Sequence, residues 1–285
     1  MQNKILNGKL LAQEILDNVS LEIKNIQNNK QRVPCLAVIL IGNDPASAVY
    51  VRNKKIACSK VGIKSLEFIL SDNVTQIELT KLVDQLNTNN DVDGILVQLP
   101  LPKHLDGKLI IDSIFSNKDV DGFSRYNMGS LALNVPNIRP CTPHGVMYIL
   151  DSIQDMQYQG KHAVILGTST IVGRPMMLEL INRGATVTVC NSKTPDVAGI
   201  IAMADILVVA VGKPNFAQGS WLKKNCIVID VGINRLDTGN LCGDVDFATA
   251  VDLASYITPV PGGVGPMTIA MLIQNTLTCY EINKK

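Results

Sequence analysis

The stretch HAVILGTSTIVGRP, residues 162–175, decides the fold because it joins a short apolar run to a glycine loop and the start of a helix. A strand, a glycine loop and a helix in this order form the cradle for the pyrophosphate of a dinucleotide. The usual G-x-G-x-x-G is absent, since the glycines are Gly167 and Gly173 and Ser169 stands at the second glycine position. Taken alone, the stretch predicts either a cofactor loop of variant form or a plain strand-helix turn.

Short apolar runs alternate with helical patterns on both sides of this stretch. In the first half we expect strands at 33–42, 65–70 and 92–100 and helices at 45–61, 75–89 and 107–115. In the second half we expect strands at 162–166, 185–190, 204–212 and 226–234, helices at 172–182 and near 196–202, and a last helix from Pro266. Strand-helix alternation throughout indicates two parallel α/β units.

The periodic pattern lapses between Asp121 and Pro143, a segment with prolines at 136, 140 and 143. We therefore place a domain boundary there, with a first domain at 1–139 and a second at 140–285. This division leaves the last helix, at about 266–285, free to pack back on the first domain.

The composition limits the classes of partner. Of 285 residues, 46% are hydrophobic and 18% charged, so there is enough apolar material for packed cores. A net charge of +1, with scattered Lys and Arg, gives no electrostatic basis for binding nucleic acid or an anionic membrane. No apolar run reaches the roughly 18–20 residues of a membrane helix, and the polar start does not resemble a signal peptide. We expect a soluble, cytoplasmic protein without nucleic-acid or membrane partners.

Cysteine and histidine spacing gives no metal signature. The seven cysteines lie far apart without a C-x-x-C pair, and the three histidines have no H-E-x-x-H spacing. This spacing suits neither a zinc site nor a disulfide scaffold, and cysteine within apolar strands behaves as a small buried hydrophobe. We therefore expect reduced thiols and no metal site, and we treat His144 and His162 as structural.

The end of the strand after the glycine loop, VTVCNSKT at 187–194, bears on the choice of cofactor. A site for NAD usually places Asp or Glu there, where the carboxylate binds the ribose 2′-hydroxyl. Here Asn191, Ser192 and Lys193 instead offer hydrogen-bond donors and a positive charge, which suits the 2′-phosphate of NADP. A solvated polar turn is the simpler interpretation until another feature supports a cofactor site.

Polar residues from separate elements stand out in the first half. Tyr50 and Lys54 lie four apart on the helix predicted at 45–61, so both side chains project from one face. A lysine beside a phenol in a partly dry cleft can have its pKa lowered enough to exchange protons near neutrality, although an isolated Y-x-x-x-K is usually a surface pair. Gln98 ends the third strand, where parallel sheets present ligands, and Asp121 lies on the loop where we expect the domains to meet.

Eight motifs, in order along the chain, carry a resemblance to one family. They are DPASAVYVRNKK (44–55), GILVQLPLP (94–102), KDVDGF (118–123), RPCTPHG (139–145), GTSTIVGRP (167–175), IDVGINR (229–235), GDVDF (243–247) and TPVPGGVGPMTIAML (258–272). Together they resemble the bifunctional methylenetetrahydrofolate dehydrogenase/methenyltetrahydrofolate cyclohydrolase family over nearly the entire chain. The resemblance implies an N-terminal catalytic domain, a C-terminal Rossmann-type NADP domain, a cleft between them and a homodimer.

The resemblance also implies the chemistry. Such enzymes oxidise 5,10-methylenetetrahydrofolate by hydride transfer to NADP+ and then hydrolyse the methenyl product to 10-formyltetrahydrofolate, within the one-carbon metabolism that serves purine, methionine and histidine biosynthesis. By resemblance, Lys54 assists the hydrolysis, and Gln98 tunes and orients it. Tyr50 packs on the folate, and Asp121 hydrogen-bonds the pterin.

The same resemblance assigns the binding residues. The loop residues Pro261, Gly262 and Gly263 let the backbone approach the ligands closely. The implied cofactor residues are Thr142, Gly167, Thr168, Ser169, Ser192, Lys193, Val211, Gly212 and Ile233. Some relatives carry Arg after the first glycine of the cofactor loop, whereas this chain has Thr168, so Ser192 and Lys193 are left to recognise the 2′-phosphate.

Three other functions are weighed against this one. A dehydrogenase that has lost hydrolase activity would not need the intact Lys54 and Gln98. A non-catalytic dinucleotide-binding module would keep the glycine loop but would not need the four polar residues of the first half. An amino-acid dehydrogenase would need a lysine in a glycine-rich substrate loop, which we do not find.

Overall fold

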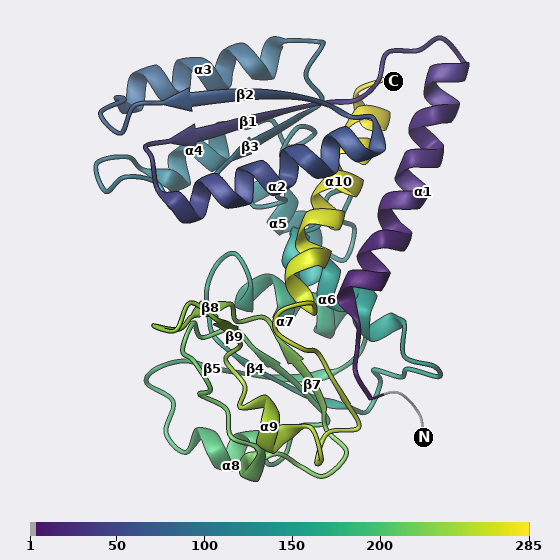
Figure 1. The fold of residues 1–285 in the computed structure, drawn as a ribbon, viewed down its shortest axis with the longest axis vertical. Coiled ribbons are helices and arrows are strands. Elements are labelled where there is room, and N and C mark those ends of the chain that lie inside the picture. Colours follow the sequence, from purple (N-terminus) through teal and green to yellow (C-terminus); the bar gives the residue numbers. More distant parts are fainter. Residues whose placement is uncertain (1–3, 285) are drawn as a thin grey trace. The chain divides into compact units, whose positions relative to one another are not determined.

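A computed structural model describes residues 4–284, which divide into two compact units (Figure 1). The three-stranded unit consists of Gln13–Cys141 and the residues from Ile269 onward. The five-stranded unit consists of Thr142–Thr268 and the residues up to Ala12. The domain bounds inferred from the sequence, 1–139 and 140–285, stay a prediction.

The three-stranded unit is built on a parallel sheet with strand order β2-β1-β3. Its strands are β1 (Cys35–Ile41), β2 (Lys64–Leu70) and β3 (Gly94–Val97). Helices α2 (Pro45–Val61) and α3 (Gln76–Thr88) connect them, and α4 (Gly107–Ser113) follows β3. Every residue of β1 and β3 is buried, as expected for strands covered on both faces. On one face, alternate residues of β1 pack with apolar side chains of α3 and α4 into a single core.

The five-stranded unit has a parallel sheet with strand order β10-β7-β6-β4-β5. Its strands are β4 (His162–Leu166), β5 (Thr186–Cys190), β6 (Ile206–Val209), β7 (Ile227–Asp230) and β10 (Tyr256–Ile257). Helices α7 (Gly173–Asn182), α8 (Val197–Ile201) and α9 (Phe247–Ala250), the 3-10 helix Gly219–Trp221 and the antiparallel pair β8 (Asn234–Arg235) and β9 (Leu241–Cys242) complete it. The predicted alternation of strands and helices is thus confirmed in both units, with strands shorter than the apolar runs.

Three helices were not expected: α1 (Gly8–Asn28), α5 (Arg125–Ala132) and α6 (Cys141–Asp151). The sequence does contain the signal for α1, because its buried side chains recur at helical spacing. They are Ala12, Ile15, Val19, Ile23 and Ile26. The prolines at 136, 140 and 143 argued against helices in this segment, so α5 and α6 were not predicted. Pro143 is, however, the third residue of α6, where the backbone N–H has no helical partner to lose.

The predicted start of the last helix at Pro266 is wrong, because α10 runs from Val264 to Asn283. Pro266 is its third residue and lies within the first turn, whose N–H groups have no partner in the helix. A helix can therefore begin before a proline by up to one turn. Within residues 4–284, no helix combines the length and the apolarity that crossing a bilayer requires.

Candidate active site

Each sheet contains one point where the strand order reverses, and several of the predicted site residues lie at these points. The chain leaves β1 for β2 on one side and returns to place β3 on the other, and it does the same around β4 with β5 and β6. In open parallel sheets, ligands bind beyond the carboxyl ends of the strands at such a switch point. Gln98 directly follows β3, and Gly167 directly follows β4.

In the three-stranded unit the structure joins Lys54 to Gln98. The Lys54 Nζ donates a hydrogen bond to the Gln98 Oε1 at 3.0 Å, and the Gln98 Nε2 donates to the backbone oxygen of Leu99 at 2.7 Å. The second bond fixes the orientation of the amide, so that its oxygen faces the amine. Lys54 is carried by α2, whose N-terminus is capped by the Asp44 side chain accepting from the Ser47 N–H at 2.8 Å.

Tyr50 lies one helical turn before Lys54 on α2. Its side chain is 43% exposed, so one part of the ring is available to a ligand while the rest lies against the protein. An amphipathic phenol of this kind suits contact with a planar heterocycle. This geometry agrees with the role expected of Tyr50 but does not test it.

Asp121 lies in the segment between α4 and α5 and is partly buried. Burial raises the pKa of its carboxyl group to about 6, the charge of Lys54 acts in the opposite direction, and Asp119 adds a smaller upward contribution. The charges of Asp121 and Lys54 are therefore close enough to act on one another. Together with Gln98, they form the candidate catalytic cluster of this unit.

Asp119 shapes the segment that carries Asp121, a role the sequence did not reveal. It is 1% exposed and accepts hydrogen bonds from the N–H groups of Gly122 at 3.0 Å and Ser124 at 2.7 Å. It also accepts from the Asn127 Nδ2 at 2.9 Å. The D-x-D-G order in KDVDGF is a turn signal that points to it, since Asp side chains commonly bond to backbone N–H groups a few residues on.

In the five-stranded unit the glycine loop requires its two glycines. Gly167 has a φ of +120°, and a Cβ there would lie 2.3 Å from the Ala210 backbone oxygen. A Cβ on Gly173 would lie 2.0 Å from the Gly167 backbone oxygen. The Ser169 Oγ accepts from the N–H of Val172 at 3.1 Å, so its hydroxyl closes the loop at the start of α7.

A cavity of about 290 Å³ opens at this loop. Five predicted cofactor residues line it, namely Gly167, Thr168, Ser169, Ser192 and Val211. Of the other predicted cofactor residues, Lys193 and Gly212 are exposed on neighbouring turns and do not line it. Lys213, which no sequence motif singled out, is the one charged residue among the described residues that line this cavity. A glycine loop at a helix start, with a cavity beside it, fits the pyrophosphate and ribose of a dinucleotide.

Two buried carboxylates hold the loops around this cavity. Asp244 accepts from the backbone N–H groups of Val211 at 2.6 Å, Gly212 at 2.8 Å and Lys213 at 2.9 Å. Asp230 accepts from the Asp244 N–H at 2.9 Å, and burial raises the pKa of Asp230 to about 6. The IDVGINR and GDVDF motifs therefore support the loop after β6.

The remaining predicted residues lie elsewhere in the same unit. Pro261, Gly262, Gly263 and Ile233 border a separate cavity of about 120 Å³. Thr142 does not line either cavity, and its Oγ1 lies 3.0 Å from the Thr268 Oγ1, within hydrogen-bond distance. Among the described residues, no group of His, Cys, Asp and Glu is arranged to hold a metal ion.

The fold and the two clusters define an α/β protein with a glycine loop suited to a dinucleotide in one sheet and a lysine, amide and carboxylate cluster in the other. Residues 140–284 match the family model of the tetrahydrofolate dehydrogenase/cyclohydrolase NAD(P)-binding domain, and residues 6–121 match that of the corresponding catalytic domain. The chain belongs to the tetrahydrofolate dehydrogenase/cyclohydrolase family.

Relatives resemble the chain over its full length. It is 56% identical to the bifunctional protein FolD of Neisseria gonorrhoeae over 99% of both chains. The structure of the bifunctional enzyme FolD from Campylobacter jejuni matches with a TM-score of 0.95 at 48% identity, covering 98% of both chains. The Trypanosoma brucei FolD structure, a complex with NADP cofactor and inhibitor, matches with a TM-score of 0.94 at 38% identity, covering 99% of this chain and 98% of that one.

These findings confirm the family, the two parallel α/β domains and the pair of enzymatic activities expected from the sequence. They also confirm a dinucleotide-binding second domain. They exclude the amino-acid dehydrogenase and the non-catalytic binding module as descriptions of the chain. The roles of individual residues stay predictions.

Proposed function

We propose that this enzyme oxidises 5,10-methylenetetrahydrofolate with NADP+ and then hydrolyses the 5,10-methenyl product to 10-formyltetrahydrofolate. The observation that carries the proposal is the hydrogen bond from the Lys54 Nζ to the Gln98 Oε1 beside the desolvated carboxyl of Asp121. A structural lysine on a helix surface would need neither the oriented amide nor the neighbouring carboxyl group. The proposal assigns the chemistry to the switch point of the three-stranded sheet.

In the oxidation, the methylene carbon loses a hydride and becomes the carbon of a methenyl cation. NADP+, when bound, supplies the hydride acceptor, and the protein supplies binding and orientation. We assign Asp121 to accept a hydrogen bond from the N–H donors of the pterin, and Tyr50 to pack on its ring. At neutral pH a carboxyl group with a pKa of about 6 is mostly ionised, and its burial strengthens such a bond.

In the hydrolysis, water adds to the methenyl carbon, loses a proton, and the bond from this carbon to N5 then breaks as N5 is protonated. The first proton needs an acceptor close to the carbon, and the second needs a donor. We assign Lys54 to this exchange, with its neutral amine accepting and its ammonium form donating. Gln98 accepts a hydrogen bond from either form, so it holds the nitrogen in place through both steps.

We propose NADP+ rather than NAD+ as the cofactor, with Ser192 and a nearby cation recognising the 2′-phosphate. Ser192 lines the cavity at the glycine loop and offers a hydroxyl but no charge. Lys193 was the cation expected from the sequence, and Lys213 is the cation on the cavity wall. A phosphate carrying close to two negative charges is bound most strongly by a charged donor.

The wider setting is also a proposal. The enzyme acts as a homodimer in the cytoplasm and supplies one-carbon units for purine, methionine and histidine biosynthesis. Its folate-binding catalytic domain spans 1–139, its NADP domain 140–285, and the last helix packs back on the former. Full-length similarity to bifunctional bacterial relatives and seven free cysteines, as in a reducing compartment, support this setting.

An absorbance assay tests the proposed function. Purified protein is mixed with 5,10-methylenetetrahydrofolate and either NADP+ or NAD+, and reduced nucleotide and methenyl product are followed separately. We expect reduction of NADP+ and transient methenyl product that decays to 10-formyltetrahydrofolate. Absence of nucleotide reduction with either cofactor, or methenyl decay at the rate seen without enzyme, would contradict the proposal.

A further inference from the structure

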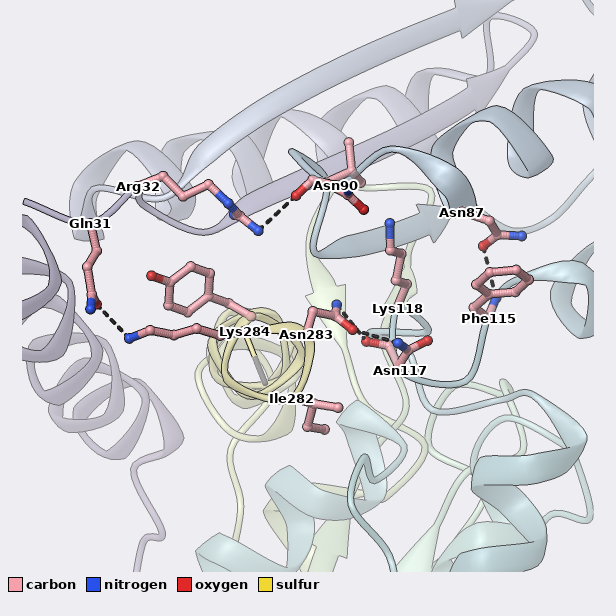
Figure 2. A pocket seen from close by; sticks show the side chains of 12 residues that line it. Gln31, Arg32, Asn87, Asn90, Phe115, Asn117, Lys118, Ile282, Asn283 and Lys284 are labelled. Atoms are coloured by element: carbon pink, nitrogen blue, oxygen red, sulfur yellow. Dashed lines mark hydrogen bonds between the residues drawn. The ribbon is translucent and has the colours of Figure 1, made fainter.

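A cavity in the three-stranded unit, shown in Figure 2, lies at the edge of the sheet opposite the candidate catalytic cluster. Its volume is about 730 Å³, within the range of small-molecule sites. Arg32 precedes β1 and Val92 precedes β3, so the cavity is at the amino ends of these strands, whereas Gln98 follows the carboxyl end of β3. The last turns of α10 and the segment after α4 complete its wall. The proposed folate chemistry does not use it.

Among the residues that the structure describes, the wall of this cavity carries positive charge and no carboxylate. Its charged lining residues are Arg32, Lys118 and Lys284, and none of the residues lining it is Asp or Glu. Arg32 is neutralised by the buried Asp93, which accepts at 2.6 Å and 2.8 Å from its two terminal nitrogens. Lys118 and Lys284 form no ion pair with any residue that the structure describes. The cavity therefore presents two ammonium groups without an ion-pair partner, of which that of Lys284 donates to the Gln31 Oε1 at 2.6 Å.

Lys118 is the central feature of the wall. Its side chain is almost fully buried, with 6% exposure of the residue, and burial lowers its pKa. Its Nζ donates to the backbone oxygens of Leu86 at 3.0 Å and Asn89 at 2.8 Å, at the C-terminal end of α3. These neutral acceptors and the helix dipole offset part of the cost of burial. An ammonium group has three donors, and no group of the described chain engages the third.

The other lining groups are suited to a polar ligand with a planar ring. In Figure 2, Lys284 lies on one side of the cavity and Phe115 on the other, with Lys118 between them. Phe115 is 52% exposed, so one face of its ring is available for stacking. Asn90 is also exposed, and its side-chain amide offers both a donor and an acceptor.

We propose that this cavity binds a small organic phosphate of nucleotide size. The phosphate accepts from Lys118 and Lys284, and the remainder of the ligand lies toward Asn90 and Phe115. The size of the ligand follows from the cavity volume, and its charge follows from a wall whose described residues include cations and no carboxylate. An anionic ligand would form the ion pair that the buried Lys118 ammonium lacks, and this pairing would favour its binding.

Calorimetric titration of the full-length protein tests the proposal. NADP+ is kept at saturation so that the dinucleotide site is occupied, and AMP, ribose 5-phosphate and adenosine are titrated separately. We expect AMP to bind with a Kd below about 1 mM, which corresponds to more than about 4 kcal/mol. Adenosine, which lacks the phosphate, should bind at least tenfold more weakly. Equal binding of AMP and adenosine, or no heat from AMP at millimolar concentration, would overturn the proposal.

Charge variants locate the binding. Lys284→Glu reverses one exposed cation of the cavity, and Lys81→Glu makes the same change on the exposed surface of α3 outside it. We expect AMP affinity to fall at least fivefold for Lys284→Glu and to stay within twofold for Lys81→Glu. Lys118→Met should abolish AMP binding, and if this buried variant does not fold, the Lys284 and Lys81 pair still decides. Equal AMP affinity in Lys284→Glu and Lys81→Glu would assign the binding to another place and overturn the proposal.

The proposed stacking on Phe115 is tested independently of phosphate binding by the two lysines. Ribose 5-phosphate carries the phosphate of AMP without its base, so it should bind more weakly than AMP to the unmodified protein. Phe115→Ala should remove this difference, because the base then has no aromatic ring on which to stack. An undiminished preference for AMP in Phe115→Ala would contradict the placement of the ring. A failed folate assay would leave all these titrations interpretable, since none uses the catalytic reaction.

Discussion

The two sheets share one topology at their sites but supply different kinds of groups there. Each places its functional residues where the strand order reverses, between β1 and β3 in one sheet and between β4 and β6 in the other. In the three-stranded unit the site consists of reactive side-chain atoms, such as the Lys54 Nζ and the Gln98 Oε1. In the five-stranded unit it consists chiefly of backbone and of missing side chains, as at Gly173. Chemistry on a folate carbon needs a particular reactive atom, whereas a pyrophosphate needs N–H groups and space.

The contrast between the two sheets is tested most strongly by removing the Lys54 Nζ. Lys54→Met keeps the apolar stem but removes the group assigned to proton transfer. We expect hydrolysis of the methenyl substrate to slow by about 10²- to 10⁴-fold, as is typical for loss of a general acid-base group. The affinity for NADP+, measured by fluorescence titration, should stay nearly unchanged.

The adjacent lysine provides the control. Lys55→Met makes the same chemical change one residue along α2, where the Lys55 Nζ pairs with the Glu67 Oε2 at 3.0 Å on the surface. Such exposed pairs contribute little to stability, so this variant should hydrolyse within about twofold of the normal rate. Normal hydrolysis by Lys54→Met would remove Lys54 from its role and break the contrast between the two sheets.

In the five-stranded unit, we expect the largest effect from adding a methyl group at a glycine of the cofactor loop. In Gly173→Ala the new Cβ would lie 2.0 Å from the Gly167 backbone oxygen, so the glycine loop must move. We expect NADP+ affinity to fall by about 100-fold or more, since the loop no longer presents its backbone to the pyrophosphate. The folded fraction of the variant should keep hydrolysing added methenyl substrate, because that reaction needs no dinucleotide.

Gly129→Ala is the matched control for this change. Gly129 lies in α5, and a Cβ there meets nothing within 4 Å, so the variant should fold and bind NADP+ normally. If Gly173→Ala bound NADP+ with unchanged affinity, the loop would not recognise the cofactor through its backbone.

Local signals predicted the sheets and the glycine loop, because apolar periodicity and turn residues act over a few positions. Gly167 and Lys54 could be singled out in this way, each by its place at the end of a strand or on the face of a helix. The resemblance to the family, spread over eight motifs, supplied their chemical roles.

Some supporting residues could not be recognised from the sequence, because their hydrogen-bond partners lie far away along the chain. Asp244 is the main support of the loop at 211–213, yet its partners lie more than 30 residues earlier in the chain. Asp230 is a similar case, since it accepts from the N–H groups of Asp244 and Val245, 14 and 15 residues later in the chain. Lys213 was missed for the same reason, because its position on the cavity wall depends on how this loop is held. Asp119 differs, because its partners lie within its own segment and a local turn signal points to it.

The raised pKa of Asp121 predicts a pH-dependent cost to stability. Its pKa is about 6 in the folded protein and 3.8 as an ordinary value, so the folded state binds this proton more tightly than the unfolded state. The proton stabilises the fold below pH 3.8, and this contribution is lost as the pH rises through 6. Asp121→Asn should therefore be more stable than the unmodified protein by about 1–3 kcal/mol at pH 7.5 and by much less near pH 4.5.

Thermal unfolding at the two pH values measures this difference. The exposed Asp84→Asn makes the same charge change on α3 and should show no such gain at pH 7.5. The folate KM of Asp121→Asn should rise about tenfold, because the ionic acceptor for the pterin is gone. A variant less stable than the unmodified protein at pH 7.5 would show that Asp121 is not held in a desolvated site.

The smallest expected effect separates two lysines of the five-stranded unit. Lys193 follows Ser192 in the sequence, whereas Lys213 lines the same cavity as Ser192, with its Nζ 5.7 Å from the centre of the Phe216 ring. If position on the wall decides phosphate recognition, Lys213→Met should reduce the ratio of kcat/KM for NADP+ to that for NAD+ by about tenfold, near 1.4 kcal/mol. Lys193→Met should reduce it by less than about threefold, and the exposed Lys224→Met should leave it unchanged. A larger loss in Lys193→Met would mean that the side chain at the end of β5, not the wall of the cavity, provides the charge. The five-stranded unit would then resemble the three-stranded unit, because its function would depend on a charged side chain, Lys193, that the sequence alone had already singled out.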